Sequence, residues 1–389
     1  MPAQRRLVER MRGFGTTIFA EMSALALETG SVNLGQGFPD TAGAPAVLDA
    51  AVAAIRDGHN QYPPGPGIPE LRQAISDHQR RCYGLEYDPA TEVLVTAGAT
   101  EAIAAALLAL VDSGDEVVLF EPYFDSYAAC VALAGATRRS VTLERSGQDW
   151  GFDPAALERA VTGRTRAIVL NTPHNPTGTV FGPEELAAVA DVALRHDLIV
   201  ISDEVYEHLL FDGRTHTPIA TLPGMRERTI TISSAGKTFG VTGWKIGWAC
   251  APPDLLAAVR TVKQFLTYVN GAPFQPAVAQ ALATAEHTAP AQQLQAQRDR
   301  LCDGLLVLGY DVIRPQATYF ATVDVGANGV EFCRELPRRA GVVAIPSSVF
   351  YDSAAGDHYV RVAFCKRPET IDEALRRMAT ASAPEEARR

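Results

Sequence analysis

Two lysines in the second half of the chain have the surroundings that a chemically active amine needs. Lys237 ends the run SSAGK at residues 233–237, directly after an apolar β-branched stretch, and Lys245 follows soon after. A lysine held among small groups and near another cation can lose its proton and attack a carbonyl carbon. Ser234 and Lys245 would bring a hydroxyl and a second positive charge to one anion. Taken alone, the run also fits an ordinary surface lysine.

A second motif could bind that anion. Gly98, Ala99 and Thr100 stand between an apolar run at 92–96 and a helical pattern over 101–111. Small residues let the backbone approach a ligand, and the free N–H groups and the dipole of a helix start attract negative charge. The same residues would equally make a plain turn with a helix cap, so this motif by itself leaves both interpretations open.

Two further motifs offer partners for a heteroaromatic ligand. Asp203 ends the run LIVIS, with Tyr206 close behind, and its carboxylate needs a partner because a lone buried charge is costly. The partner could be a protonated ring nitrogen, or the carboxylate could cap the next helix. Asn175, in the segment NTPHNPTG, could donate to a phenolate-type oxygen, although Asn-Pro and Thr-Gly are also common turn formers.

The elements that must position these groups are apolar runs alternating with helical stretches between about residues 40 and 275. The runs predict strands at 92–96, 116–120, 167–170, 198–202, 229–233 and 246–251. This alternation is typical of an α/β fold with a mostly parallel sheet covered by helices. Ligands bind beyond the carboxyl ends of such strands, so we expect the polar groups to converge on one site. Later runs at 319–325 and 359–364 predict a smaller α+β domain, completed by the N-terminal segment.

Composition and charge exclude several classes of protein. The 389 residues are 47% hydrophobic and 21% charged, which excludes a disordered or collagen-like chain. The net charge is −10 and the basic residues are scattered, so nucleic acid is not an expected partner. The six cysteines lack metal-ligand spacing and predict reduced thiols with no metal. Without a signal sequence or an apolar run of roughly 18 residues, we expect a cytoplasmic protein with no membrane partner.

Together these motifs resemble the pyridoxal-phosphate enzymes of aspartate aminotransferase fold, known as fold type I or aminotransferase class I/II. The resemblance runs from NLGQGFPD at residues 33–40 to RVAFCK at 361–366, and it rests on the joint order of the motifs. It implies a mostly parallel seven-stranded sheet between helices, with a smaller α+β domain. The expected ranges are 1–39 for a segment that joins the small domain, 40–275 for the large cofactor-binding domain, and 276–389 for the small domain.

The resemblance also implies pyridoxal 5′-phosphate as cofactor and a role for each motif residue. Lys237 would link to the cofactor and move the proton at the substrate Cα, and Asp203 would hold the ring nitrogen protonated. Tyr206 and Asn175 would bond the ring oxygen, and Phe124 would stack on the ring. The remaining cofactor contacts would be Gly98, Ala99, Thr100, Ser234, Lys245 and, from a neighbouring subunit, Tyr62. Arg361 would bind the substrate α-carboxylate, with Gly37 and Asn175 beside it.

The implied reaction is a ping-pong transfer of an amino group from an L-amino acid to a 2-oxo acid, in a homodimer with sites at the subunit interface. NQYPPGPG, ITISSA and GAPFQPAVA look most similar to N-succinyldiaminopimelate aminotransferases. They favour N-succinyl-LL-2,6-diaminopimelate with 2-oxoglutarate, in lysine biosynthesis. The alternative is a broad-specificity glutamine, methionine or kynurenine aminotransferase, with or without cysteine-S-conjugate β-lyase activity. Phe19, Tyr319 and Phe274 are candidates for the side-chain pocket, and Lys245 stands where many relatives have arginine.

Overall fold

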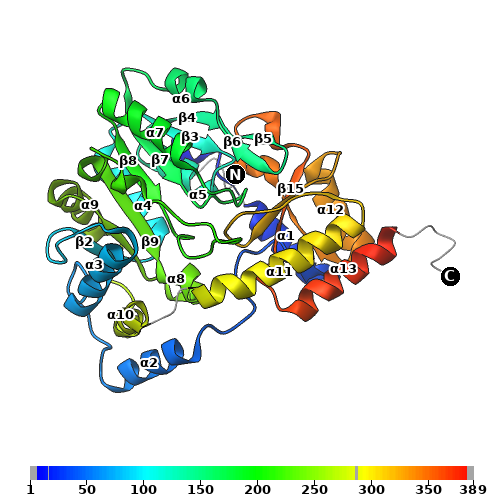
Figure 1. The fold of residues 1–389 in the computed structure, drawn as a ribbon, viewed down its shortest axis with the longest axis horizontal. Helices are drawn as coiled ribbons and strands as arrows, with labels where there is room; N and C mark the ends of the chain where they lie inside the picture. The colour runs from blue at the N-terminus through cyan, green and yellow to red at the C-terminus, as the bar shows by residue number, and fades with distance from the viewer. Residues whose placement is uncertain (1–6, 16, 285–287, 383–389) are drawn as a thin grey trace.

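A seven-stranded sheet organises the larger part of the molecule in the computed structural model, which describes residues 7–15, 17–284 and 288–382 (Figure 1). In spatial order the strands are β2 (Val93–Thr96), β10 (Gly247–Cys250), β9 (Thr229–Ser234), β8 (Ile199–Asp203), β7 (Thr165–Asn171), β3 (Glu116–Glu121) and β4 (Thr137–Thr142). Neighbours pair in parallel, apart from β10, which is antiparallel to β2 and β9. The predicted α/β class and mostly parallel seven-stranded sheet are confirmed.

The edge strand β4 is the one member of this sheet that the apolar runs did not predict. The other strands are buried almost throughout, whereas Arg138 and Arg139 of β4 are exposed and Val141 is buried. An edge strand pairs on one side only and can face water, so it does not need a continuous apolar run.

Helices cover both faces of the sheet because successive residues of a strand point to opposite sides. On β3, Val117 and Leu119 belong to one apolar cluster, and Val118 and Phe120 belong to another. Helices α4 (Ala99–Leu110), α5 (Asp125–Leu133) and α9 (Pro253–Leu266) pack in the first cluster, α6 (Pro154–Ala160) and α7 (Pro183–Arg195) in the second, and α2 (Pro45–Arg56), α3 (Pro69–Tyr83) and α10 (Phe274–Thr284) in a third.

The smaller part is an antiparallel four-stranded sheet with helices packed on it (Figure 1). Its strands, in spatial order, are β11 (Asp311–Ile313), β12 (Phe320–Asp324), β15 (Tyr359–Ala363) and β14 (Ile345–Pro346). Its helices are α1 (Ile18–Thr29), α11 (Thr288–Val307), α12 (Gly329–Ala340) and α13 (Pro368–Ser382). None of the helices within the described ranges is long and apolar enough to cross a membrane.

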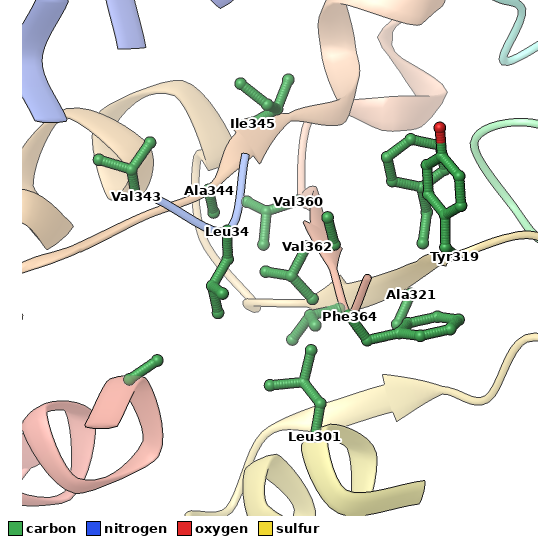
Figure 2. Packing of buried hydrophobic residues seen from close by; sticks show 14 of the residues in the cluster. Leu34, Leu301, Tyr319, Ala321, Val343, Ala344, Ile345, Val360, Val362 and Phe364 are labelled. Carbon is green, nitrogen blue, oxygen red and sulfur yellow. The ribbon is translucent and has the colours of Figure 1, made fainter. Parts of the chain in front are cut away.

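The N-terminal segment packs on this smaller part. Strand β1 (Val32–Asn33) pairs in parallel with β13 (Val342–Val343), and Leu34 lies in the same apolar core as Leu301 and Val362 (Figure 2). The predicted division of the chain after residues 39 and 275 stays a prediction. Residues 1–6 and 383–389 of the outer ranges lie outside the described residues.

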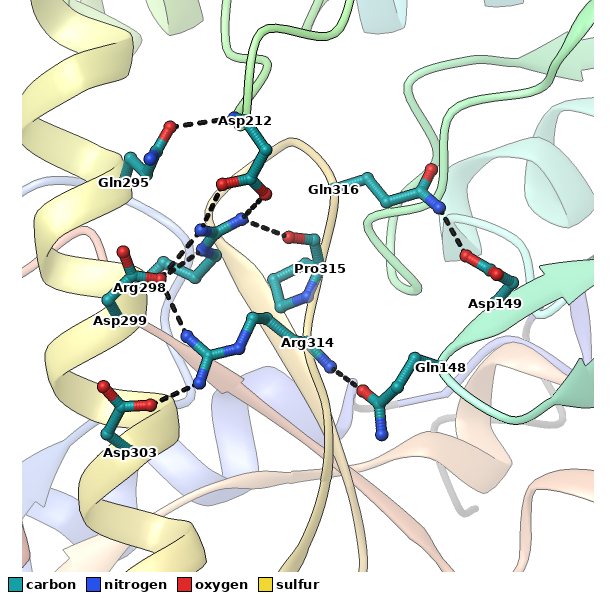
Figure 3. Close-up of polar contacts among 10 residues, drawn as sticks. All are labelled: Gln148, Asp149, Asp212, Gln295, Arg298, Asp299, Asp303, Arg314, Pro315 and Gln316. Atoms are coloured by element: carbon teal, nitrogen blue, oxygen red, sulfur yellow. Dashed lines mark hydrogen bonds and ion pairs between the residues drawn. The ribbon is translucent and has the colours of Figure 1, made fainter.

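A charged network joins α11 to the hairpin formed by β5 (Glu144–Ser146) and β6 (Asp149–Gly151) (Figure 3). The buried Arg298 donates to both carboxylate oxygens of Asp212, and Arg314 donates to Asp299. The Arg314 backbone N–H in turn donates to Gln148 at 2.8 Å. Because the buried guanidinium has a bidentate partner, the network offsets much of the cost of removing it from water.

Candidate active site

The carboxyl ends of β7, β8 and β9 open into one cavity of about 420 Å³, which the smaller part closes on the other side. Nearly all of the residues predicted from the sequence line it. They are Gly37, Gly98, Ala99, Thr100, Phe124, Asn175, Asp203, Tyr206, Ser234, Lys237, Lys245 and Arg361. Residues from distant stretches of the chain therefore meet where the strands end, as expected for an α/β sheet.

Three of the predicted residues, Tyr62, Phe274 and Tyr319, do not line this cavity. The Tyr62 side chain is 82% exposed, and its ring lies 5.5 Å from that of Tyr268. Its contact with a neighbouring subunit stays a prediction. Phe274 stacks on Trp244 with ring centroids 4.6 Å apart and does not line this cavity, so its place in the side-chain pocket stays a prediction. Phe19 does line it.

One corner of the cavity is shaped for an anion. Helix α4 begins at Ala99, earlier than predicted, so the N–H groups of Ala99 and Thr100 belong to its first turn and have no partner within the helix. Gly98 precedes them with a φ of +78°, a conformation that favours glycine. A Cβ atom on Gly98 would lie 2.9 Å from Lys245 Nζ. The Lys245 ammonium therefore lies directly beside the start of the helix.

Lys237 stands next to this corner, in the short helix α8 (Ala235–Thr238) that follows β9. Its Nζ donates to the Tyr319 hydroxyl at 2.6 Å and lies 5.7 Å from the centre of the Tyr206 ring. Desolvation, assisted by the nearby cations Lys245 and Arg361, lowers the pKa of Lys237 to about 8. A substantial fraction of the side chain is therefore neutral at mildly alkaline pH, which is the form that attacks a carbonyl carbon.

Asp203 is the buried acid of the cavity. Tyr127 donates its hydroxyl to Asp203 Oδ2 at 2.5 Å, and the Val205 N–H donates to Oδ1 at 3.3 Å. Burial raises the pKa of Asp203 to about 6 although these hydrogen bonds act in the opposite direction. A buried carboxylate with a raised pKa is short of neighbouring positive charge, and a protonated ring nitrogen would supply that charge.

Arg361 on β15 is the buried cation of the opposite wall. Its Nη1 donates to Asn175 Oδ1 at 3.1 Å and its Nη2 to the Gly35 carbonyl at 3.3 Å. Its Nε is buried and has no hydrogen-bond partner among the described residues. The Phe320 ring centre lies 3.9 Å from the guanidinium carbon, and burial lowers the pKa of Arg361 to about 10. This guanidinium has donor capacity left for a carboxylate.

Several polar residues of the cavity were missed in the sequence, among them Tyr127, Asp125 and Asn171. Tyr127 holds Asp203, Asp125 lines the cavity at the start of α5, and Asn171 donates to the Asp203 carbonyl at 2.8 Å. Tyr127 follows Phe124 by three residues, a spacing that places both on one face of a helix and could have indicated its position. Asn171 is the last residue of β7 and is in register with Asp203, a relation that requires the strand order.

These groups fit pyridoxal phosphate, the cofactor that the resemblance implies. The phosphate suits the corner beside Lys245 at the start of α4. A Cβ atom on Gly98 would crowd Lys245 Nζ, and one on Gly247 would collide with the Gly98 backbone, so both glycines keep this corner open. Asp203 offers a buried carboxylate for a ring nitrogen, and the Lys237 amine offers the nucleophile for an aldehyde.

A comparison with protein families settles the class. The family model for aminotransferase class I and II matches residues 29–378. The chain belongs to this family. As a class I and II aminotransferase, it is an enzyme that depends on pyridoxal phosphate, and the cofactor expected from the motifs is confirmed.

Similar proteins support the same class. The aminotransferase is 55% identical over 387 residues to a protein of Mycobacterium tuberculosis called probable N-succinyldiaminopimelate aminotransferase DapC, covering 96% of this chain and 98% of that one. It is 40% identical to the methionine aminotransferase of Escherichia coli, covering 94% and 95%. A solved structure of N-succinyldiaminopimelate aminotransferase from M. tuberculosis superposes with a TM-score of 0.95, at 55% identity, over 96% of this chain and 100% of that one.

Proposed function

We propose that this aminotransferase moves the amino group of N-succinyl-LL-2,6-diaminopimelate to 2-oxoglutarate, in lysine biosynthesis. The observation that carries the proposal is the 55% identity, over nearly the whole chain, with the mycobacterial protein that bears this substrate's name. The motifs NQYPPGPG, ITISSA and GAPFQPAVA support the same choice.

We assign the chemistry to the residues that line the cavity. Pyridoxal phosphate, when bound, supplies an electron-withdrawing ring that stabilises negative charge at the substrate Cα. Arg361 would bind the substrate α-carboxylate through its planar fork of donors, assisted by Asn175. This contact would orient the Cα–H bond toward Lys237, whose neutral amine would take the proton.

The remaining residues would hold the cofactor in place. Asp203, itself held by Tyr127, would keep a proton on the ring nitrogen, because a buried carboxylate stabilises a neighbouring cation. Tyr206 and Asn175 would bond the ring oxygen, and Phe124 would cover a ring face. Gly98, Ala99, Thr100, Ser234 and Lys245 would bind the phosphate, with Gly37 close to the substrate.

A half-reaction screen tests the substrate. The enzyme is converted to its pyridoxamine form, and the spectral change with each oxo acid and, from the aldehyde form, with each amino acid is followed. We expect succinyldiaminopimelate to react at least tenfold faster, as kcat/KM, than methionine, glutamine or kynurenine, a difference of about 1.4 kcal/mol in the transition state. Equal or slower reaction would show that the substrate proposal is wrong and would leave the enzyme class untouched.

A broad-specificity aminotransferase is the second candidate, and the 40% identity to the methionine aminotransferase favours it. Methionine and glutamine would then be the best donors in the same screen. A β-lyase side activity can be distinguished from transamination, because elimination from a β-substituted cysteine releases pyruvate without an oxo acid. Pyruvate formed only when an oxo acid is present would argue against the lyase.

We also propose that the enzyme works as a homodimer in which Tyr62 serves the neighbouring subunit. The exposed ring of Tyr62 lies against the half-exposed Tyr268, and an interface would cover both. Mixing Tyr62→Ala with Lys237→Ala subunits tests this, since a hybrid dimer would regain one site with an intact lysine and an intact Tyr62. Activity that does not rise on mixing would contradict the proposal.

A cytoplasmic location is proposed on the state of the cysteines. All six are free in the structure, and five of them are buried. Thiols persist in reducing compartments, whereas secreted proteins tend to pair them. Cell fractionation checks the proposal, and recovery of the enzyme outside the cytoplasm would contradict it.

A further inference from the structure

The Tyr319 hydroxyl lies between Lys237 and the N-terminal segment. The Tyr319 side chain is 1% exposed, and its hydroxyl points away from the aliphatic core residues around it (Figure 2). Lys237 Nζ lies 2.6 Å from this oxygen, and the Gly37 carbonyl oxygen lies 2.6 Å from it on the other side. Tyr319 therefore bridges the lysine and the backbone of Gly37.

The Gly37 carbonyl decides the direction of both hydrogen bonds. A carbonyl oxygen only accepts, so the single proton of the Tyr319 hydroxyl must point at Gly37. The hydroxyl can then only accept from Lys237. Burial raises the pKa of Tyr319, so the proton stays on the phenol.

This direction determines what the neutral amine of Lys237 has left to use. A neutral amine has two N–H bonds and one lone pair, and the lone pair is the nucleophile and the base. With one N–H engaged by Tyr319, the lone pair is not used in that contact and stays available to the cavity that Lys237 lines. A hydroxyl free to turn its proton toward the amine would bond that lone pair and weaken it for both tasks.

The surrounding packing keeps the bridge in place. A Cβ atom on residue 37 would lie 2.4 Å from the Phe320 ring, so glycine allows this backbone to approach the aromatic rings closely. The Tyr206 ring meets the Tyr319 ring edge-on at 5.2 Å, and the Phe364 N–H donates to the Tyr319 carbonyl at 3.0 Å. Tyr319 thus has little freedom to move away from Lys237.

We propose that Tyr319 is a positioning residue that keeps the lone pair of Lys237 directed into the cavity, with the Gly37 carbonyl setting the direction of the hydrogen bond. The proposal rests on the role of Lys237 in the proposed function, and it extends that role to a residue that the sequence suggested only for the side-chain pocket.

Attachment of the cofactor to the apoenzyme tests the proposal without any substrate. Wild-type and Tyr319→Phe apoenzymes are mixed with pyridoxal phosphate between pH 7 and 10, quenched with borohydride, and the adduct on Lys237 is quantified by peptide mass. The amine is neutral in both proteins on the high-pH plateau, so a difference there reports orientation. We expect the plateau rate constant of Tyr319→Phe to fall roughly tenfold, as for the loss of one good hydrogen bond.

Two controls separate positioning from structural damage. Tyr123→Phe removes a hydroxyl that bonds Asp352 at 2.9 Å outside the cavity, and it should leave the plateau within about twofold of wild type. Affinity for 4-deoxypyridoxine phosphate, which lacks the aldehyde, should be the same in wild type and Tyr319→Phe. An unchanged plateau, or a plateau that falls together with this affinity, would overturn the proposal. Failure of the wild type to attach the cofactor at Lys237 would instead overturn the assigned role of that lysine.

Discussion

Two buried carboxylates, Asp203 and Glu207, stand four residues apart in the chain but differ in what surrounds them. Asp203 and Glu207 are 5% and 2% exposed; Asp203 is the last residue of β8, and Glu207 lies in the segment that follows. Asp203 faces the cavity, and burial raises its pKa to about 6. Glu207 faces the interior. Burial acts on it in the same direction, but nearby histidines and the hydroxyls of Tyr83 and Ser233 outweigh that effect, so its pKa lies below the ordinary value.

The difference teaches that burial of charge does not by itself mark a site. His78, Glu207 and His208 have ligand-type atoms within 4.8 Å of one another, as a metal centre would. Yet Glu207 already accepts two hydrogen bonds, and His78 Nε2 lies 2.7 Å from His208 Nε2. Glu207 is satisfied from within the protein, whereas Asp203 and Arg361 keep bonding capacity for something that is not protein.

The largest effect is expected on the cavity side, at Lys237. Lys237→Ala removes the nucleophile and the base together, and turnover should fall by at least roughly 10³-fold. Steady-state kinetics and the loss of the borohydride adduct measure this change. A variant with near wild-type turnover would place the reactive amine elsewhere.

Asp203→Asn should separate stability from activity. The folded-state pKa of about 6 lies above the ordinary value, so the folded protein binds more protons than the unfolded chain, and stability falls as the pH rises through this window. Above pH 6 the full penalty is present, and the neutral Asn should stabilise the apoenzyme by about 3 kcal/mol. Activity should fall roughly 10²-fold because the ring nitrogen loses its partner. Urea unfolding at pH 7.5 measures the stability, and a less stable variant would contradict the view that burial of the Asp203 charge costs stability.

Glu207→Gln is the matched change at the satisfied carboxylate and should change stability in the opposite direction. A carboxylate whose pKa is lowered on folding stabilises the protein above its unfolded pKa, and that stability is lost as the pH falls through the folded value. The amide fits the two hydroxyl donors poorly, so the free energy of unfolding should drop by about 1–3 kcal/mol. The same urea experiment measures it, and an unchanged midpoint would mean that the cluster contributes little.

Arg361→Lys sharpens the comparison from the substrate side. A point charge replaces a planar fork of donors, so KM should rise roughly tenfold to a hundredfold with a smaller change in kcat. Kinetics with a fixed saturating oxo acid measure both constants. A change confined to kcat would indicate that the guanidinium acts on the chemical step and does not hold the ground-state substrate.

The smallest effect is expected at Lys245→Arg. The ammonium already lies beside the start of α4, so exchanging one cation for another should alter the cofactor dissociation constant by less than about tenfold. Fluorescence titration of the apoenzyme measures it. A much tighter complex would show that the lysine holds the phosphate poorly.

The parts of the fold that the sequence predicted are those whose local residue pattern alone indicates burial. Buried parallel strands need apolar residues on both faces, so β3, β7, β8 and β9 were visible as apolar runs, and the polar residues after them indicated the site. Edge strand β4 escaped because one of its sides faces water and arginines replace the apolar residues.

The parts that could not be predicted depend on contacts between distant segments. Tyr83 on α3 and Ser233 on β9 meet Glu207, and Gly37 meets Tyr319, at separations that no local pattern encodes. The placement of Phe274 against Trp244 is of the same kind, since an aromatic residue fits a pocket or a core equally well by composition.

The two walls of the cavity have separate origins in the chain. Lys237, Asp203 and Asn175 come from the ends of sheet strands, while Phe19, Gly37 and Arg361 come from the smaller part. A mutation at Phe19 could change which amine donor is accepted while leaving Lys237 and Asp203 in place. Enzymes of this architecture can therefore differ in substrate preference while sharing the same catalytic residues. The wall that the smaller part contributes, beginning at α1, is the place to engineer new selectivity.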